Sequence, residues 1–189
     1  MKTKYIVAFF VFTFGASLAA APPREGVVFG IGAQTTVWDE EQHATHEGDW
    51  TMISTVPTGG LMVVGGYRFN EFFELGLRFS LGFPAQIDDD MGILLRVLPQ
   101  ARFILPVDEI NLYASLQGGY SFFRDAAHYQ MSECHSAAFG AALGIELPVS
   151  DAINVFAEAE FLYQLDAEIG DNHGFLRYSN LNISVGILF

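Results

Sequence analysis

Cysteine is almost absent from this chain, which has one such residue, Cys134, among its 189 residues. A single cysteine cannot form an internal disulfide, so no disulfide framework holds the fold together. Positive charge is also scarce: nine lysines and arginines stand against 22 acidic residues, a formal net charge of −13. This argues against a nucleic-acid-binding protein, which needs a basic surface. After the first 21 residues Gly, Pro or a charge interrupts every apolar run, so no spanning helix is predicted there.

The N-terminal segment has the pattern of a secretory signal peptide. Basic residues at its start precede a short apolar run and a small-residue segment at 17–21. The apolar run is shorter than the ~20 residues that a spanning helix needs, which disfavours an uncleaved anchor. No cysteine stands at the cut, which excludes a lipoprotein. We expect cleavage after Ala19 or Ala20, which makes residues 1–20 the signal peptide and residues 21–189 one mature domain.

The remaining composition favours a β-barrel. Apolar residues make up 51% of the chain, which also contains 19 glycines and 18 phenylalanines. Helices and closed barrels are the two structures that satisfy their backbone hydrogen bonds in lipid. A secreted, apolar chain with no predicted spanning helix therefore fits a transmembrane β-barrel.

Period-two alternation of apolar with small or polar residues predicts eight strands, because successive side chains of a strand point to opposite faces. Short connections alternate with long ones, as the periplasmic turns and external loops of outer-membrane barrels do. Pro99 interrupts the fourth strand and removes a ladder hydrogen bond, so the register there stays open. The long connections are 39–57, 84–91, 124–135 and 165–174. The predicted strands are 26–38, 58–69, 72–83, 92–105, 110–123, 136–147, 152–164 and a last strand that ends at Phe189.

The last strand carries the clearest family signal. Residues 179–189 alternate between large apolar and mostly small or polar side chains, and the final residue is Phe189. This segment resembles the closing strand of bacterial outer-membrane β-barrels, in which a terminal aromatic is read by the assembly machinery. Ile187 stands where that family more often has an aromatic. The resemblance implies an all-β, eight-stranded antiparallel up-and-down barrel of the OmpA membrane-domain or OmpX type, with the OmpW type second, and an assembly signal at Ile187 and Phe189.

The charge on the two strand faces separates a membrane barrel from a soluble one. A lipocalin-like barrel points its charges outward, whereas here the apolar face is almost uncharged and would aggregate in water. The other face carries glycines and charges, which suits the narrow interior of an eight-stranded barrel. Charges in such an interior must pair, so we predict a balanced ionic network that plugs the lumen. Its members are Arg68, Glu74, Arg78, Arg96, Arg102, Glu146, Glu158 and Glu160.

Aromatic residues near the strand ends suit girdles at the two membrane interfaces. The periplasmic girdle is predicted to contain Tyr67, Phe69, Phe72, Phe73, Phe103 and Phe189. The outer girdle is predicted to contain Tyr120, Phe122, Tyr163 and Tyr178.

Histidines gather in the predicted external loops beside many carboxylates. A divalent-cation site at the barrel mouth is one interpretation. Solvated loops that collect polar residues are the other, and the spacing shows no metal-binding motif. We therefore assign no metal site, and we predict no cofactor. His135 and Ser136 are adjacent and point to opposite faces of a strand, so no catalytic arrangement is predicted. The histidines are His43, His46, His128, His135 and His173.

The sequence thus leaves three functional hypotheses. The first is a structural or surface-interaction protein whose loops contact a host surface, an extracellular ligand or lipopolysaccharide. The second is a narrow passive channel of the OmpW type, and the third a lipid-modifying barrel enzyme. We expect a monomer in the bacterial outer membrane, with lipid and the barrel-assembly machinery as partners and no nucleic acid. Inner-face apolar residues leave room for the channel: Met62, Val64, Leu98, Phe156 and Leu162.

Overall fold

A computed structural model describes residues 25–44, 50–53, 58–84, 93–124, 134–150, 152–168 and 175–189. The predicted signal peptide lies outside these residues. No helix among them is long and apolar enough to cross a membrane. The strands are β1 (Gly26–Ala44), β2 (Trp50–Ile53), β3 (Thr58–Asn70), β4 (Phe73–Pro84), β5 (Ile93–Val107), β6 (Ile110–Arg124), β7 (Cys134–Ser150), β8 (Ile153–Glu168) and β9 (Phe175–Leu188).

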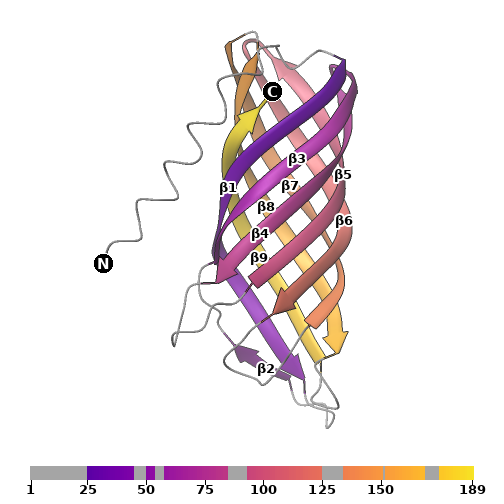
Figure 1. Cartoon of the computed structure of the whole chain (residues 1–189), viewed down its shortest axis with the longest axis vertical. Coiled ribbons are helices and arrows are strands. Elements are labelled where there is room, and N and C mark those ends of the chain that lie inside the picture. The colour runs from indigo at the N-terminus through magenta and orange to yellow at the C-terminus, as the bar shows by residue number, and fades with distance from the viewer. Residues whose placement is uncertain are drawn as a thin grey trace, which may run out of the picture.

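Eight of these strands close into an antiparallel barrel in the order β1-β3-β4-β5-β6-β7-β8-β9, with β9 paired back to β1. The strands tilt around the barrel axis, and each lies beside its neighbour in sequence (Figure 1). The three short connections, β3–β4, β5–β6 and β7–β8, lie at the same end as the C-terminus, and β2 lies at the other (Figure 1). This architecture confirms the predicted up-and-down barrel.

Residue type explains the short turns. In the β3–β4 turn the side-chain Oδ1 of Asn70 accepts a hydrogen bond from the backbone N–H of Phe72 at 2.9 Å. In the β7–β8 turn the Ser150 hydroxyl accepts one from the Ala152 N–H at 3.2 Å. Asp108 in the β5–β6 turn has a positive φ of 52°. Short polar side chains replace missing ladder bonds and tolerate this conformation better than apolar ones do.

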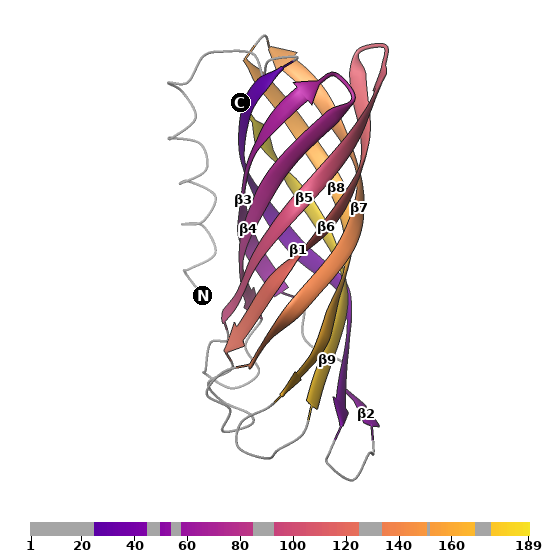
Figure 2. The same cartoon turned by 90° about the vertical axis from the view of Figure 1, so that its right-hand side faces the viewer.

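The outer end of β1 differs from the prediction. We predicted a strand to Trp38 followed by a polar loop over 39–57, but β1 continues to Ala44 and β2 pairs with its last four residues. Strands in a closed barrel are staggered, so β1 extends past the start of β3 while it stays paired with β9 as far as Phe175. β2 pairs along the edge that this stagger leaves (Figure 2). The residues at 39–44 show no apolar alternation, which is why the prediction stopped early.

Pro99 does not shift the register of β5. Val97 pairs with Tyr120 of β6, and Gln100 pairs with Gln117, so the same register holds on both sides of the proline. Pro99 faces outward, and the β5–β6 ladder is interrupted only at its position and at the residue before it. The alternation therefore continues through the proline, and the side chains of Gln100 and its neighbours two residues away stay inside.

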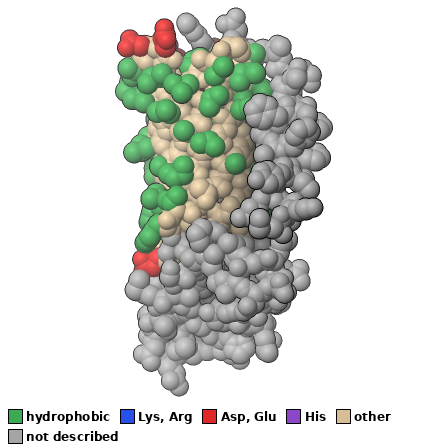
Figure 3. All heavy atoms as spheres, turned by 90° about the vertical axis from the view of Figure 1, so that its left-hand side faces the viewer, with side chains coloured by type: hydrophobic (Ala, Val, Ile, Leu, Met, Phe, Trp, Pro, Cys, Tyr) green, Lys and Arg blue, Asp and Glu red, His purple; other side chains and the backbone are tan. Residues whose placement is uncertain are grey.

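The outward face of the barrel is an apolar belt. Every one of the eight barrel strands presents at least one large apolar side chain that is more than 35% exposed, and Val27 and Leu143 reach 72% and 70%. Figure 3 shows hydrophobic side chains over the described part of one face, with acidic side chains only towards its ends. A belt of this extent is unfavourable in water and favourable against hydrocarbon, which confirms the predicted sidedness.

Aromatic side chains form a row at the end that carries the short turns. Ring centroids are 5.0 Å apart for Tyr67 and Phe69, 5.9 Å for Phe69 and Phe73, and 5.4 Å for Phe73 and Phe103. Since these residues come from three adjacent strands, β3, β4 and β5, they line one arc of the rim. The arc is the predicted periplasmic girdle over this part of the barrel.

Candidate functional site in the barrel lumen

All eight charged residues predicted for the lumen lie on inward-facing strand positions, and each of them is at most 4% exposed. The arginines lie on β3, β4 and β5, and the glutamates on β4, β7 and β8. Ion pairs divide seven of them into two groups at different levels of the barrel, and Arg96 is the eighth. The sequence predicted their common face but not these groups.

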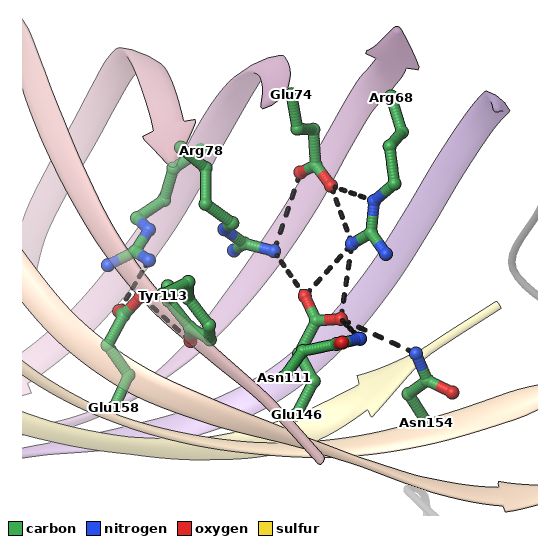
Figure 4. A network of polar contacts seen from close by, with 9 residues as sticks. Arg68, Glu74, Arg78, Asn111, Tyr113, Glu146, Asn154 and Glu158 are labelled. Carbon is green, nitrogen blue, oxygen red and sulfur yellow. Dashed lines mark hydrogen bonds and ion pairs between the residues drawn. The ribbon is translucent and has the colours of Figure 1, made fainter. Parts of the chain in front are cut away.

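The first group, the periplasmic cluster, consists of Arg68, Glu74, Arg102 and Glu146. Arg68 Nη2 lies 2.9 Å from Glu74 Oε2 and 3.0 Å from Glu146 Oε1, and Arg102 Nη1 lies 3.1 Å from Glu146 Oε1 and 3.4 Å from Glu74 Oε1. Each cation therefore contacts both anions (Figure 4). Arg68 on β3 and Glu146 on β7 stand four strands apart in a ring of eight, so their pair crosses the lumen.

The second group, the central cluster, consists of Arg78, Glu158 and Glu160. Arg78 Nη2 lies 2.5 Å from Glu158 Oε1, and Arg78 Nη1 lies 2.6 Å from Glu160 Oε1. Arg78 is on β4 and both glutamates are on β8, again on opposite sides of the ring. One arginine thus ties two walls of the barrel together through two separate hydrogen bonds, which a single-point ammonium could not do as well.

Uncharged side chains complete the coordination of the glutamates. They are inward-facing polar residues that the sequence placed on the correct face without a role. The signal that could have found them is their position, two residues or one strand away from a charge. The donors are Asn111 and Asn154 to Glu146 at 3.4 Å each, Tyr113 to Glu158 at 3.1 Å, Asn182 to Glu160 at 2.8 Å, and Gln117 to Glu160.

Arg96 on β5 is also buried in the lumen and is 1% exposed. Its guanidinium carbon lies 6.0 Å from the ring centroid of Tyr178, at the limit of a cation–π contact. The placement of Tyr178 in the outer girdle is therefore wrong. Tyr178 shares the inward face of β9 with the buried residues Asn180 and Asn182, and alternation turns it towards the lumen.

The lumen also contains apolar patches, so it is not uniformly charged. One patch spans β1, β3, β8 and β9, and its members are 0–1% exposed. A second patch spans β5, β7 and β8 and is equally buried. All five inner-face apolar residues noted in the sequence belong to them. The members are Val28, Met62, Val64, Phe156 and Leu188 in the first patch, and Leu98, Ala138 and Leu162 in the second.

Two inner-face glycines make room for an aromatic ring on the neighbouring strand. A Cβ added at Gly144 would overlap the Tyr113 ring and lie 2.8 Å from the carbonyl oxygen of Ala157. A Cβ at Gly186 would lie 2.5 Å from Cε1 of Phe156. Each glycine is the cross-strand partner of the ring residue, so a small residue on the inner face of one strand allows a large one on its neighbour, as the narrow interior of an eight-stranded barrel requires.

Three of the five predicted loop histidines, His46, His128 and His173, lie outside the described residues. His43 is on β1, but its side chain is not described. His135 faces outward beside Tyr120, whose hydroxyl hydrogen-bonds to its Nδ1. Ser136 faces inward and donates to a backbone carbonyl of β8 at 2.8 Å, so the two adjacent side chains do point to opposite sides. The described residues contain no group of three or more His, Cys, Asp or Glu that could hold a metal ion.

The end of β9 is joined to β1 by backbone hydrogen bonds. The Phe189 N–H donates to the Phe29 carbonyl at 2.7 Å, and the Phe29 N–H donates back at 3.2 Å. Ile187 pairs with Ile31 on one side and Val155 on the other. Ile187 and Phe189 therefore lie in the seam that closes the barrel, and their role as an assembly signal stays a prediction.

No protein-family model matches this chain, and no curated protein matches it. Among solved structures it is similar to Neisserial surface protein A, with a TM-score of 0.57 and 12% identity over 84% of this chain and 95% of that one. For the outer membrane protein OprG from Pseudomonas aeruginosa the TM-score is 0.59 and the identity 10%, over 89% of this chain and 96% of that one. A third similar structure is Ail, the attachment invasion locus protein of Yersinia pestis, solved with the heparin analogue sucrose octasulfate. Its TM-score is 0.52 and its identity 13%, over 88% of this chain and 100% of that one.

Identities this low show the fold alone. These similar structures are small eight-stranded barrels of bacterial outer membranes, and this chain has their fold over nearly their whole length. The apolar belt described above is an independent observation that also indicates a barrel in a membrane. The fold resemblance drawn from the last strand is therefore confirmed.

Proposed function

We propose that this protein is an outer-membrane barrel whose lumen is closed to ions and which acts through its external loops. The observation that carries the proposal is the pair of ionic clusters, in which Arg68 and Arg78 each reach a glutamate on the opposite wall. Buried charges persist only where they are paired, and an ion crossing the lumen would have to separate them. We further propose that residues 1–20 are removed on export and that the barrel is a monomer.

The charge of the connecting segments suggests the chemistry of a loop partner. The predicted external connections together contain 13 Asp and Glu and one basic residue, Arg124. Such a surface favours a cationic partner, or an anionic surface bridged by divalent cations, and disfavours a sulfated sugar such as the heparin analogue sucrose octasulfate of the Ail complex. The segments counted are the predicted connections 39–57, 84–91, 124–135 and 165–174.

Conductance in planar lipid bilayers tests the closed lumen. We expect no stable current steps from the mature protein, and steps to appear when both clusters are replaced by serine, at Arg68, Glu74, Arg78, Arg102, Glu146, Glu158 and Glu160. Large, stable channels from the unaltered protein would contradict the proposal. Binding of the same protein in nanodiscs to oligolysine and to heparin tests the loops: we expect binding to oligolysine that weakens with salt, and none to heparin without divalent cations.

A narrow passive channel is the second candidate. The apolar patch around Phe156 favours it, because an apolar wall inside a barrel is what a small apolar solute would contact. Faster entry of such a solute into vesicles that contain the protein, without ionic current, supports this alternative over a fully closed lumen. A lipid-modifying enzyme is the third, and the opposed directions of His135 and Ser136 disfavour it. Altered lipid A or acyl chains in cells that express the protein would support the enzyme.

A further inference from the structure

The two ionic clusters lie close together but are not joined by an ion pair within the described part of the chain. Tyr113 lies between them. Its hydroxyl donates to Glu158 of the central cluster at 3.1 Å, and its ring centroid lies 4.4 Å from the guanidinium carbon of Arg102 in the periplasmic cluster. The hydrogen-bonded chain of the central cluster therefore ends at Tyr113, since the contact with Arg102 is a cation–π contact.

Beside this gap, β4, β5 and β6 carry buried polar atoms that have no hydrogen-bond partner among the described residues. Both Oε1 and Nε2 of Gln100 are in this state, as are Nε and Nη2 of Arg102. So are Oε1 of Gln117, Oγ of Ser115 and Nε of Arg78. In the β5–β6 ladder Gln100 stands opposite Gln117, and Arg102 stands opposite Ser115, so four of these residues form one continuous patch. The most exposed of them, Gln117, is 6% exposed.

The chemistry of this patch identifies what it binds. Buried donors and acceptors are nearly always satisfied, by protein or by ordered water. The patch offers both kinds, with amide, hydroxyl and guanidinium donors next to two amide oxygens. The lumen already balances four arginines with four glutamates, so an ion would add an uncompensated charge at high cost. Water both donates and accepts, and a buried water typically makes about three hydrogen bonds of this kind.

We propose that the patch formed by Gln100, Arg102, Ser115 and Gln117 is a binding site for a short chain of ordered water molecules. The Gln117 amide already donates to Glu160. Waters that join the open edge of Arg102 to Gln117 therefore complete a hydrogen-bonded path from the periplasmic cluster to the central cluster. The seven charges of the two clusters then respond to substitution as one unit. The site does not depend on the proposed role of the loops.

Water-to-protein NMR on the mature chain in nanodiscs tests the site directly. We expect cross-relaxation from long-lived water to the side-chain amides of Gln100 and Gln117. In Gln100→Leu the water signal at Gln117 is lost, and in the matched control Gln164→Leu, another buried glutamine of the lumen, it is retained. Ser115→Ala, a smaller change, weakens the signal and serves if Gln100→Leu does not fold. Absence of water signals at both glutamines in the unaltered protein overturns the proposal.

Two further results separate water from the alternatives. Crystals soaked in bromide are expected to show no anomalous peak at the patch, and a peak there would mean that the site binds an anion. Glu146→Gln and Glu158→Gln, one in each cluster, are expected to be non-additive by about threefold or more in the unfolding equilibrium constant. Tyr113 carries part of this coupling, so it weakens in the Gln100→Leu background if water carries the rest, and coupling that is undiminished there refutes the water path.

Discussion

Replacing Arg78 by methionine tests whether the lumen network holds the barrel together. Methionine keeps much of the length of the side chain and removes its charge. The substitution leaves Glu158 and Glu160 without their shared cation, and both glutamates are at most 3% exposed. Neither can turn to water without breaking the inner packing of β8. The barrel must therefore either bury an unpaired carboxylate or protonate it.

The magnitude follows from the contacts that remain. Breaking a buried ion pair by removing one partner typically destabilises a protein by about 3–5 kcal/mol. Glu158 keeps the Tyr113 hydroxyl, and Glu160 keeps the amides of Asn182 and Gln117. These donors offset part of the loss, so we expect about 3 kcal/mol, which is a rise of roughly a hundredfold in the unfolding equilibrium constant.

Reversible urea unfolding in lipid vesicles measures this change. The chain has two tryptophans, and Trp38, 46% exposed on the outer face, reports on departure from lipid. The control removes all three charges together, as Arg78→Met with Glu158→Gln and Glu160→Gln, and should lie within about 1 kcal/mol of the unaltered protein. If Arg78→Met costs less than about 1 kcal/mol at an unchanged m-value, the cluster does not hold the walls together. If the triple variant is as unstable as the single one, the unpaired charge is not the cause.

Further outcomes are expected from the same unfolding assay. Gly144→Ala should destabilise by about 1–3 kcal/mol because its methyl overlaps Tyr113, whereas Gly118→Ala, where the nearest atoms to an added Cβ are 3.9 Å away, should change stability by less than about 0.5 kcal/mol. Leu77→Arg in the middle of the outer belt should cost about 2–4 kcal/mol, and Val149→Arg near the rim at most about 1 kcal/mol; equal costs would contradict the membrane depth assigned to them. Raising the salt concentration should leave the effect of breaking the buried clusters nearly unchanged, because counter-ions do not screen charges that they cannot approach. Calorimetry with micromolar zinc should show no heat, and a stoichiometric signal would reinstate a loop metal site.

Strand alternation carried most of the fold prediction, for a physical reason. A strand has a side-chain period of two, so a slip of one residue would move every apolar residue to the wrong face. The sequence Phe73 to Leu81 allows only one assignment, with Glu74 and Arg78 inside. The partners of those charges were not predictable in the same way. Which arginine meets which glutamate depends on the stagger of strands on opposite sides of the lumen, and Arg78 reaches β8 rather than a neighbour of β4.

The two errors of the sequence prediction arise where alternation stops being informative. Beyond Thr36 a bulge shifts the β1–β9 register, so that Val37 and Trp38 are both exposed on the outer face. The polar residues that follow look like a loop, although they continue the strand. Tyr178 is an aromatic residue near a rim, which by residue type predicts a girdle position, but the parity of β9 turns it inward. At both places residue composition misleads, because the geometry of the strand decides which way a side chain points.

The order of the charges along the chain links the closed lumen to closure of the barrel. All four lumen arginines lie between positions 68 and 102, on β3 to β5, and three of the four glutamates lie on β7 and β8. Each half of the chain alone would therefore present an inner face with an excess of one sign. Only when β3 and β4 come to stand opposite β7 and β8 are these charges neutralised, in the pairs Arg68–Glu146 and Arg78–Glu158. Neutrality of the interior is thus a property of the complete ring. A register error that separates the two sets leaves buried charges unpaired, and it is disfavoured because no ion pair then offsets their desolvation penalty.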